Sequence, residues 1–309
     1  MTLSSWYAGN ETTIITFGIT FLLAMSMQVT MRVGVLSLAG LGFYAVGSYA
    51  TGIVVLRDII PAPVAILASI VVCGLLSLAF GLALHRVRGL YLAMVTLGFV
   101  LILGVIAANG GTLTGGANGM YGVPITISAP EVVLASLVVI AAACLWERGR
   151  AGRATNALRT DQLLSTSVGI DARRMRNISF LLSGAIGGLA GSLNVLSFGA
   201  VSPSDAGFAM LTTMITVVIV GGQRSWAGVL LGAILISWLP TWLVWFEGAT
   251  REIILGLLIV VLGMFAPDGL LGVFSWLFGR LRGIRRRSVP PPVAEPPPAR
   301  QLEESSRVR

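Results

Sequence analysis

Long apolar stretches alternate with short polar ones along most of the chain. A bilayer core about 30 Å thick needs about 20 apolar residues per helix, and this rule predicts nine membrane-spanning segments. They cover residues 12–31, 33–56, 62–84, 90–108, 131–146, 178–198, 208–222, 225–246 and 252–266. The pattern predicts an all-α integral membrane protein, a polytopic bundle of about nine (eight to ten) transmembrane helices.

The distribution of arginine predicts how this bundle is oriented. The loop 147–177 carries seven Arg against three acidic residues, and residues 280–309 carry eight Arg against three Glu. Cytoplasmic loops are enriched in basic residues, so we expect this loop, the turn with Arg86 and Arg88, and the C-terminus to be cytoplasmic. Nine spans satisfy this if residues 1–11 form an extracytoplasmic N-terminus and 12–279 the transmembrane domain in the cell membrane.

The last part of the chain has a different composition from the spans. Residues 280–309 are basic and Pro-rich, which predicts a disordered cytoplasmic tail. We expect the basic run 280–287 to contact anionic membrane lipid.

Overall composition excludes several classes of protein. Hydrophobic residues make up 55% of the chain and charged residues 11%, which excludes a soluble enzyme. The net charge of +8 does not indicate nucleic-acid binding, because the arginines flank apolar spans rather than cover a soluble domain.

The polar residues argue against chemistry in the chain itself. One His (His85) and two Cys (Cys73 and Cys144) support neither a metal site nor catalysis. The sequence has no Lys, so it cannot contain the phosphate-binding loop that requires one. We therefore expect no cofactor in this chain, and ATP and Mg to be bound by partner subunits if ATP drives it.

Glycine-rich segments have two interpretations, tight helix packing or a broken helix that lines a solute path. The segment 36–44 and the outer segment 109–124 are the places where a path is predicted, although the outer segment also fits a compact turn. The candidate substrate-path residues are Ser37, Gly40, Gly42, Tyr44, Thr96, Thr114, Gly115, Gly116, Asn118 and Gly119.

The long polar loop contains a predicted amphipathic helix over residues 153–168. One face carries Ala154, Ala157, Leu158, Leu164 and Val168, interrupted by Asp161, and Gly169 ends the helix. The opposite side carries Arg153, Asn156 and Arg159. Such a helix between two spans is either a lever that docks in a partner or an interfacial helix resting on lipid.

An ordered set of segments resembles a known family. The segments are Leu36–Leu38, Arg88–Leu97, Leu113–Gly119, Gly152–Arg159, Val168–Ile170, Ser179–Ala185, Gly188–Gly191, Val218–Gly222 and Gly228–Ala233. In order and spacing they resemble the LivM-type permease of branched-chain amino acid ABC importers, from about residue 15 to 275.

The resemblance implies a type II-like ABC importer permease. Such a subunit works with two ABC ATPase subunits, a second homologous permease and an extracytoplasmic solute-binding protein. The resemblance also implies that the loop contacts the ATPase. The ATPase-coupling residues would be Gly152, Arg153, Ala154, Ala157, Leu158, Arg159, Asp161, Leu164, Val168, Gly169 and Ile170.

Other functions remain open from the sequence. The chain departs from the family pattern at Ala39–Leu41, where a His is common, at 161–167, which has one acidic residue, and at Gln223–Arg224. The alternatives are an ABC permease for urea or amides, a stand-alone secondary carrier or channel for a small neutral or zwitterionic solute, and a membrane scaffold.

Overall fold

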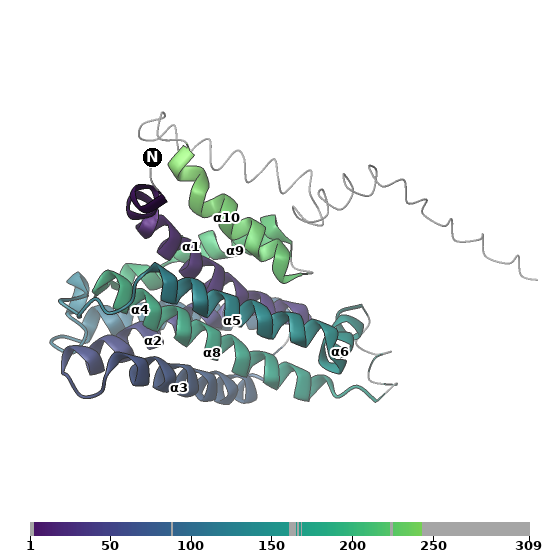
Figure 1. The fold of residues 1–309 in the computed structure, drawn as a ribbon. Helices are drawn as coiled ribbons and strands as arrows, with labels where there is room; N and C mark the ends of the chain where they lie inside the picture. The colour runs from purple at the N-terminus through teal and green to yellow at the C-terminus, as the bar shows by residue number, and fades with distance from the viewer. Residues whose placement is uncertain are drawn as a thin grey trace, which may run out of the picture. The chain divides into compact units, whose positions relative to one another are not determined.

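The structure, a computed structural model, describes residues 3–87, 89–160, 165, 167, 169–222 and 225–242, all within one unit that covers residues 1–273. The helices are α1 (Leu3–Arg32), α2 (Ala39–Leu56), α3 (Ala62–Ala83), α4 (Leu90–Asn109), α5 (Ala129–Arg148), α6 (Arg150–Thr160), α8 (Ala172–Phe198), α9 (Phe208–Gly221) and α10 (Trp226–Trp242) (Figure 1). The short elements are the 3₁₀ helices η1 (Gly116–Asn118) and η2 (Pro203–Ala206) and the strands β1 (Met120–Tyr121) and β2 (Ala200–Val201).

The described part of the chain is a helical membrane protein. Within it, six helices, α1 to α5 and α8, are long and apolar enough to cross a membrane, and α9 and α10 are shorter apolar helices. Each of the first eight predicted segments therefore contains a helix. The predicted ninth span, 252–266, and the predicted tail, 280–309, lie outside the described residues.

Two helices begin earlier than the apolar pattern predicts, because polar residues cap them. α5 starts at Ala129 rather than 131, after a capping box in which the Glu131 carboxylate accepts hydrogen bonds from the Ser128 backbone N–H (2.7 Å) and hydroxyl (2.6 Å). α8 starts at Ala172 rather than 178, because the Asp171 carboxylate accepts from the backbone N–H groups of Arg173 (2.9 Å) and Arg174 (3.1 Å). α5 is thus a full-length span of 20 residues.

The chain between α1 and α2 is not helical, although the second predicted segment began at residue 33. Gly34 turns the chain with φ +77°, a conformation that favours glycine. The Leu38 backbone N–H then donates to the Thr96 hydroxyl of α4 (3.0 Å), and α2 begins at Ala39. α1 itself extends back to Leu3, so the predicted N-terminal segment 1–11 is largely helical.

The core is a close-packed seam between α8 and the three helices α1, α2 and α3. A Cβ on Gly188 would lie 2.7 Å from Cβ of Cys73 and 2.8 Å from the Ser69 carbonyl oxygen of α3, so only glycine allows this approach. The Ser48 hydroxyl of α2 donates to the Gly191 carbonyl of α8 (2.9 Å). These α8 glycines therefore serve tight helix packing, one of the two interpretations of the glycine-rich segments.

The surrounding helices turn apolar faces outward. Large exposed side chains on α3, α4 and α5 include Leu67, Leu75, Ile102, Ile106 and Leu137. Faces of this kind are suited to lipid or to another membrane subunit, because neither requires polar groups.

A small sheet of two strands, each two residues long, joins two loops at one end of the bundle. β1 pairs antiparallel with β2, with Met120 opposite Val201 and Tyr121 opposite Ala200. The sequence did not predict this pairing, because two residues are too few to show the alternation of a strand. The pairing fixes the loop that follows α4 beside the end of α8.

Candidate functional site

Five positions far apart in sequence gather at the end of the bundle opposite the sheet, and they are joined by polar contacts. We call this the basic end, and it comprises Arg32 at the end of α1, the turn 84–87 after α3, Glu147 at the end of α5, Arg176 in α8 and Trp226 at the start of α10. The predicted cytoplasmic regions that the structure describes thus share one end of the molecule.

The first half of the predicted amphipathic helix 153–168 is present at the basic end in α6 (Arg150–Thr160), which begins three residues earlier than predicted. Leu158 is buried, Ala154 and Ala157 are half-buried, and Arg153, Asn156 and Arg159 are exposed, as predicted. Gly152 and Thr155 are also buried, and the Thr155 hydroxyl donates to the Gly152 carbonyl of its own helix (2.9 Å). The buried stripe therefore includes a threonine that the apolar pattern could not reveal.

The remaining predicted coupling residues follow α6. Gly169 has φ +86°, as expected of a glycine that ends a helix, and the Ile170 N–H donates to the Ser165 carbonyl (3.1 Å). Asp161, Leu164 and Val168 lie outside the described residues.

A single residue separates α5 from α6. Gly149 is extended (ψ 178°), and its N–H donates to the carbonyls of Leu145 (3.1 Å) and Trp146 (3.2 Å) at the end of α5. Three residues later, a Cβ on Gly152 would lie 2.6 Å from the Trp146 carbonyl oxygen and closer still to that of Glu147. α6 therefore folds tightly against the last turn of α5.

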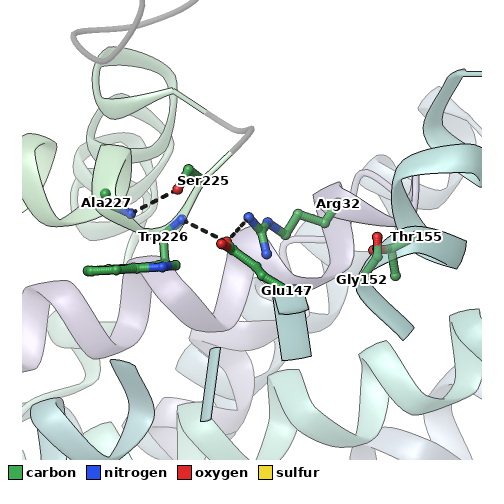
Figure 2. A network of polar contacts seen from close by, with 7 residues as sticks. All are labelled: Arg32, Glu147, Gly152, Thr155, Ser225, Trp226 and Ala227. Carbon is green, nitrogen blue, oxygen red and sulfur yellow. Dashed lines mark hydrogen bonds and ion pairs between the residues drawn. The ribbon is translucent and has the colours of Figure 1, made fainter. Parts of the chain in front are cut away.

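The Glu147 carboxylate joins three helices, as Figure 2 shows. It forms an ion pair with the Arg32 guanidinium of α1 and accepts from the Trp226 backbone N–H of α10 (3.5 Å). The two side chains are 15% (Arg32) and 30% (Glu147) exposed, so water screens their attraction less than that of a surface pair. The sequence did not predict this contact. The available signal was Glu147 itself, an acidic residue at the start of a loop that carries seven arginines.

Arg176, near the start of α8, connects that helix to the turn between α3 and α4. Its guanidinium donates to the carbonyls of Leu84 (2.7 Å), Val87 (3.1 Å) and His85 (3.4 Å), and it lies 5.8 Å from the centre of the Phe180 ring. These carbonyls lie in the turn that follows α3, where the Leu84 carbonyl also accepts from the Val87 N–H (3.0 Å). Arg176 thus links the turn after α3 to α8.

A cavity of about 160 Å³ lies beside α6 at the basic end. Its lining comes from α1, α5, α6 and α8 and includes Gln28, Arg32, Trp146, Thr155, Ser179 and Leu182. The cavity is mainly apolar and leaves space next to the middle of α6.

The predicted substrate-path residues near α2 lie together, but they are packed against neighbouring helices. Ser37 and Tyr44 are buried, and the Thr96 hydroxyl accepts from Leu38 and donates to Leu92 (2.9 Å). A Cβ on Gly40 would overlap the Ser26 hydroxyl, and one on Gly42 would lie 2.5 Å from the Phe99 ring. This arrangement favours the packing interpretation for these glycines.

The other predicted path residues lie at the opposite end of the molecule. The Thr114 hydroxyl donates to the Ala107 carbonyl (2.7 Å) and accepts from the Gly116 N–H (3.3 Å), while Asn118 is exposed. Gly115, Gly116 and Gly119 all have positive φ. Because α4 rises 1.5 Å per residue, Ala107 lies about 16 Å beyond Thr96, so the structure does not bring the two groups together.

Comparison with known proteins identifies the chain's family. Residues 10–263 match the family described as the branched-chain amino acid transport system / permease component. The chain belongs to this family. No solved structure gives a significant match.

Three transport proteins illustrate the relationship. The permease protein LivM of the high-affinity branched-chain amino acid transport system of Escherichia coli (strain K12) is 30% identical over 276 residues, and LivM of Salmonella typhimurium is 29% identical over 276 residues. Each alignment covers 77% of this chain and 64% of the relative. BraD of Pseudomonas aeruginosa, a permease protein of the same kind of system, is 27% identical over 165 residues, 52% of this chain and 53% of BraD. The chain thus spans less than two thirds of the length of these relatives.

The side chains that could bind a metal ion are scattered in the described part of the chain. This part contains no group of three or more His, Cys, Asp or Glu side chains that could hold a metal ion. Cys73 is buried and Cys144 half-buried, and both are free thiols.

Proposed function

We propose that the chain is the transmembrane permease subunit of an ABC importer that passes branched-chain or related amino acids across the cell membrane. ATP hydrolysis on two separate ATPase subunits, which hold ATP and Mg, provides the energy. A second homologous permease completes the pathway, and an extracytoplasmic binding protein delivers the solute. The supporting observation is α6, a short amphipathic helix set between two spans, in a chain that belongs to the branched-chain amino acid permease family.

In this proposal the basic end faces the cytoplasm and the ATPases. The exposed arginines of α6, Arg153 and Arg159, contact the ATPase, while Leu158 and Thr155 keep α6 attached to the bundle. The positive-inside rule supports this orientation, since most described arginines flank the basic end. The nine-span topology places the N-terminus outside and the C-terminus in the cytoplasm.

The path residues of the proposal lie at two levels. Thr114, Gly115, Gly116, Asn118 and Gly119 meet the solute at the outer end, and Ser37, Gly40, Gly42, Tyr44 and Thr96 lie deeper. The deeper residues act through backbone movement at the α1–α2 break, because their side chains are packed.

Co-purification with the ATPase subunits tests the role of α6. We expect the double charge reversal Arg153→Glu and Arg159→Glu to reduce the co-purified ATPase by about tenfold, because paired charges at interfaces contribute strongly when one partner is reversed. The matched control is Arg57→Glu. Arg57 is an exposed arginine just after the C-terminal end of α2, away from the basic end, and its reversal is expected to leave the complex intact. Full retention of the ATPase by the double variant would contradict this role for α6.

Transport in vesicles tests the function as a whole. The complete complex in proteoliposomes, supplied with binding protein and internal ATP, is expected to accumulate leucine. Accumulation by the permease alone, driven by an ion gradient, would instead identify a secondary carrier.

A further inference from the structure

We propose that Glu147 is a positioning residue that transmits movement of α6 to α1 and α10. The inference rests on the proposed function, since it concerns how an ATPase contact at α6 reaches the membrane helices. Its basis is the position of one carboxylate at the root of α6, in contact with two helices that are remote in sequence.

The backbone geometry places Glu147 where movement of α6 must pass. Glu147 lies two residues before Gly149, the single extended residue between α5 and α6. The close approach of Gly152 to the carbonyls of Trp146 and Glu147 means that α6 cannot tilt without moving the last turn of α5. The Glu147 side chain moves with that turn.

The partners of the carboxylate determine where the movement goes. Arg32 is the last residue of α1, a helix that packs along α8 and α10. Trp226 is the first residue of α10, and its N–H is one of the N-terminal groups that a helix leaves without an internal partner. A carboxylate at this place is favoured by the helix dipole as well as by the charge of Arg32.

The cavity beside α6 leaves room for the helix to move. The cavity of about 160 Å³ borders Arg32, Trp146 and Thr155, so the side of α6 toward α8 is incompletely filled. Packed interiors resist displacement, whereas a void permits it. α6 can therefore move toward the cavity while the Glu147 contacts keep its root tied to α1 and α10.

The experiment compares transport and ATP hydrolysis in the same vesicles. The wild-type complex and Glu147→Gln, each with ATPase subunits, sister permease and binding protein, are reconstituted in proteoliposomes of phosphatidylethanolamine and phosphatidylglycerol. We expect Glu147→Gln to lower the leucine taken up per ATP hydrolysed by about tenfold, with hydrolysis within about twofold of wild type, because a coupling contact changes the link between two sites. The exchanged pair Arg32→Glu with Glu147→Arg restores the ion pair to α1, but an arginine cannot accept from the Trp226 N–H of α10, so it is expected to recover only part of the ratio.

A second carboxylate in α5 supplies the matched control. Glu131→Gln is the same substitution at the other end of the same helix, where the carboxylate caps α5, and it is expected to leave leucine uptake per ATP unchanged. A merely structural role for Glu147 would lower the yield of complex and both activities together.

The outcomes separate the two proposals. A wild-type complex that hydrolyses ATP without accumulating leucine overturns the proposed function. Wild-type accumulation together with an unchanged ratio in Glu147→Gln, or an equal loss of ratio in Glu131→Gln, overturns the role of Glu147.

Discussion

The seam around α8 and the basic end are held together by different chemistry. In the seam, glycines let backbones meet and serine hydroxyls donate to carbonyls of the next helix, as Ser48 does to Gly191 and Ser77 to Phe180. At the basic end, charged side chains join helices, with Glu147 bound to Arg32 and Arg176 bound to three carbonyls. We therefore expect the seam to behave as a rigid body and helices to move at the basic end, where the charged side chains are partly exposed.

The largest effect is expected from filling the seam. Gly188→Leu would force a side chain against Cys73 and the Ser69 carbonyl of α3, and overpacking of this kind costs about 3 kcal/mol. We expect little monodisperse protein in size-exclusion chromatography and a much lower midpoint of thermal unfolding. The control is Gly98→Leu in α4, where a Cβ meets nothing within 4 Å. Equal tolerance of both variants would show that the seam is not rigid.

An intermediate effect is expected at the basic end. Arg176→Gln removes the donor that satisfies the carbonyls after α3, and a hydrogen bond to a charged group is worth about 2 kcal/mol. Hydrogen exchange is expected to rise in residues 82–87. Arg173→Gln, an exposed arginine one turn earlier in α8, should leave this exchange unchanged. Unaltered exchange in Arg176→Gln would mean that the turn is held by other contacts.

The smallest effect is expected from a single hydroxyl in the seam. Ser77→Ala deletes the hydrogen bond to the Phe180 carbonyl (2.6 Å), and bonds between membrane helices average about 0.6 kcal/mol. The midpoint of thermal unfolding should therefore fall only slightly below that of Ser136→Ala, whose hydroxyl bonds only its own helix, to Val132. If Ser77→Ala lowered the midpoint of thermal unfolding more than Arg176→Gln does, hydroxyl bonds in the seam would contribute more to stability than the charged contacts of the basic end.

Much of the fold followed from apolar stretches, and the errors lie at their ends. The predicted span began at Glu131, two residues after the start of α5, because hydropathy does not show that Ser128 and Glu131 together cap the helix. The segment 33–38 was predicted as helix from its apolar residues, but Gly34 and the Leu38–Thr96 hydrogen bond hold it in another conformation. Hydropathy measures affinity for lipid and carries no information on which backbone groups find partners.

The candidate site was predicted in outline only. The amphipathic pattern correctly located the part of the helix that lies in α6 and its exposed arginines, and the rest of the predicted helix lies largely outside the described residues. It could not pair Glu147 with Arg32 and Trp226, since these residues are 115 and 79 positions away along the chain. It also could not show that neighbouring side chains of α1 and α4 occupy the space beside the glycines at 40 and 42, whose place in a substrate path stays a prediction.

The sequence by itself determined that this is a helical membrane protein with a basic side and an amphipathic helix on that side, because these properties depend on local composition and on the 3.6-residue period. Only the tertiary structure decided which helices touch and which charges meet. Those choices depend on how closely backbones can approach, and a close approach is a property of two segments together, such as Gly188 against Cys73.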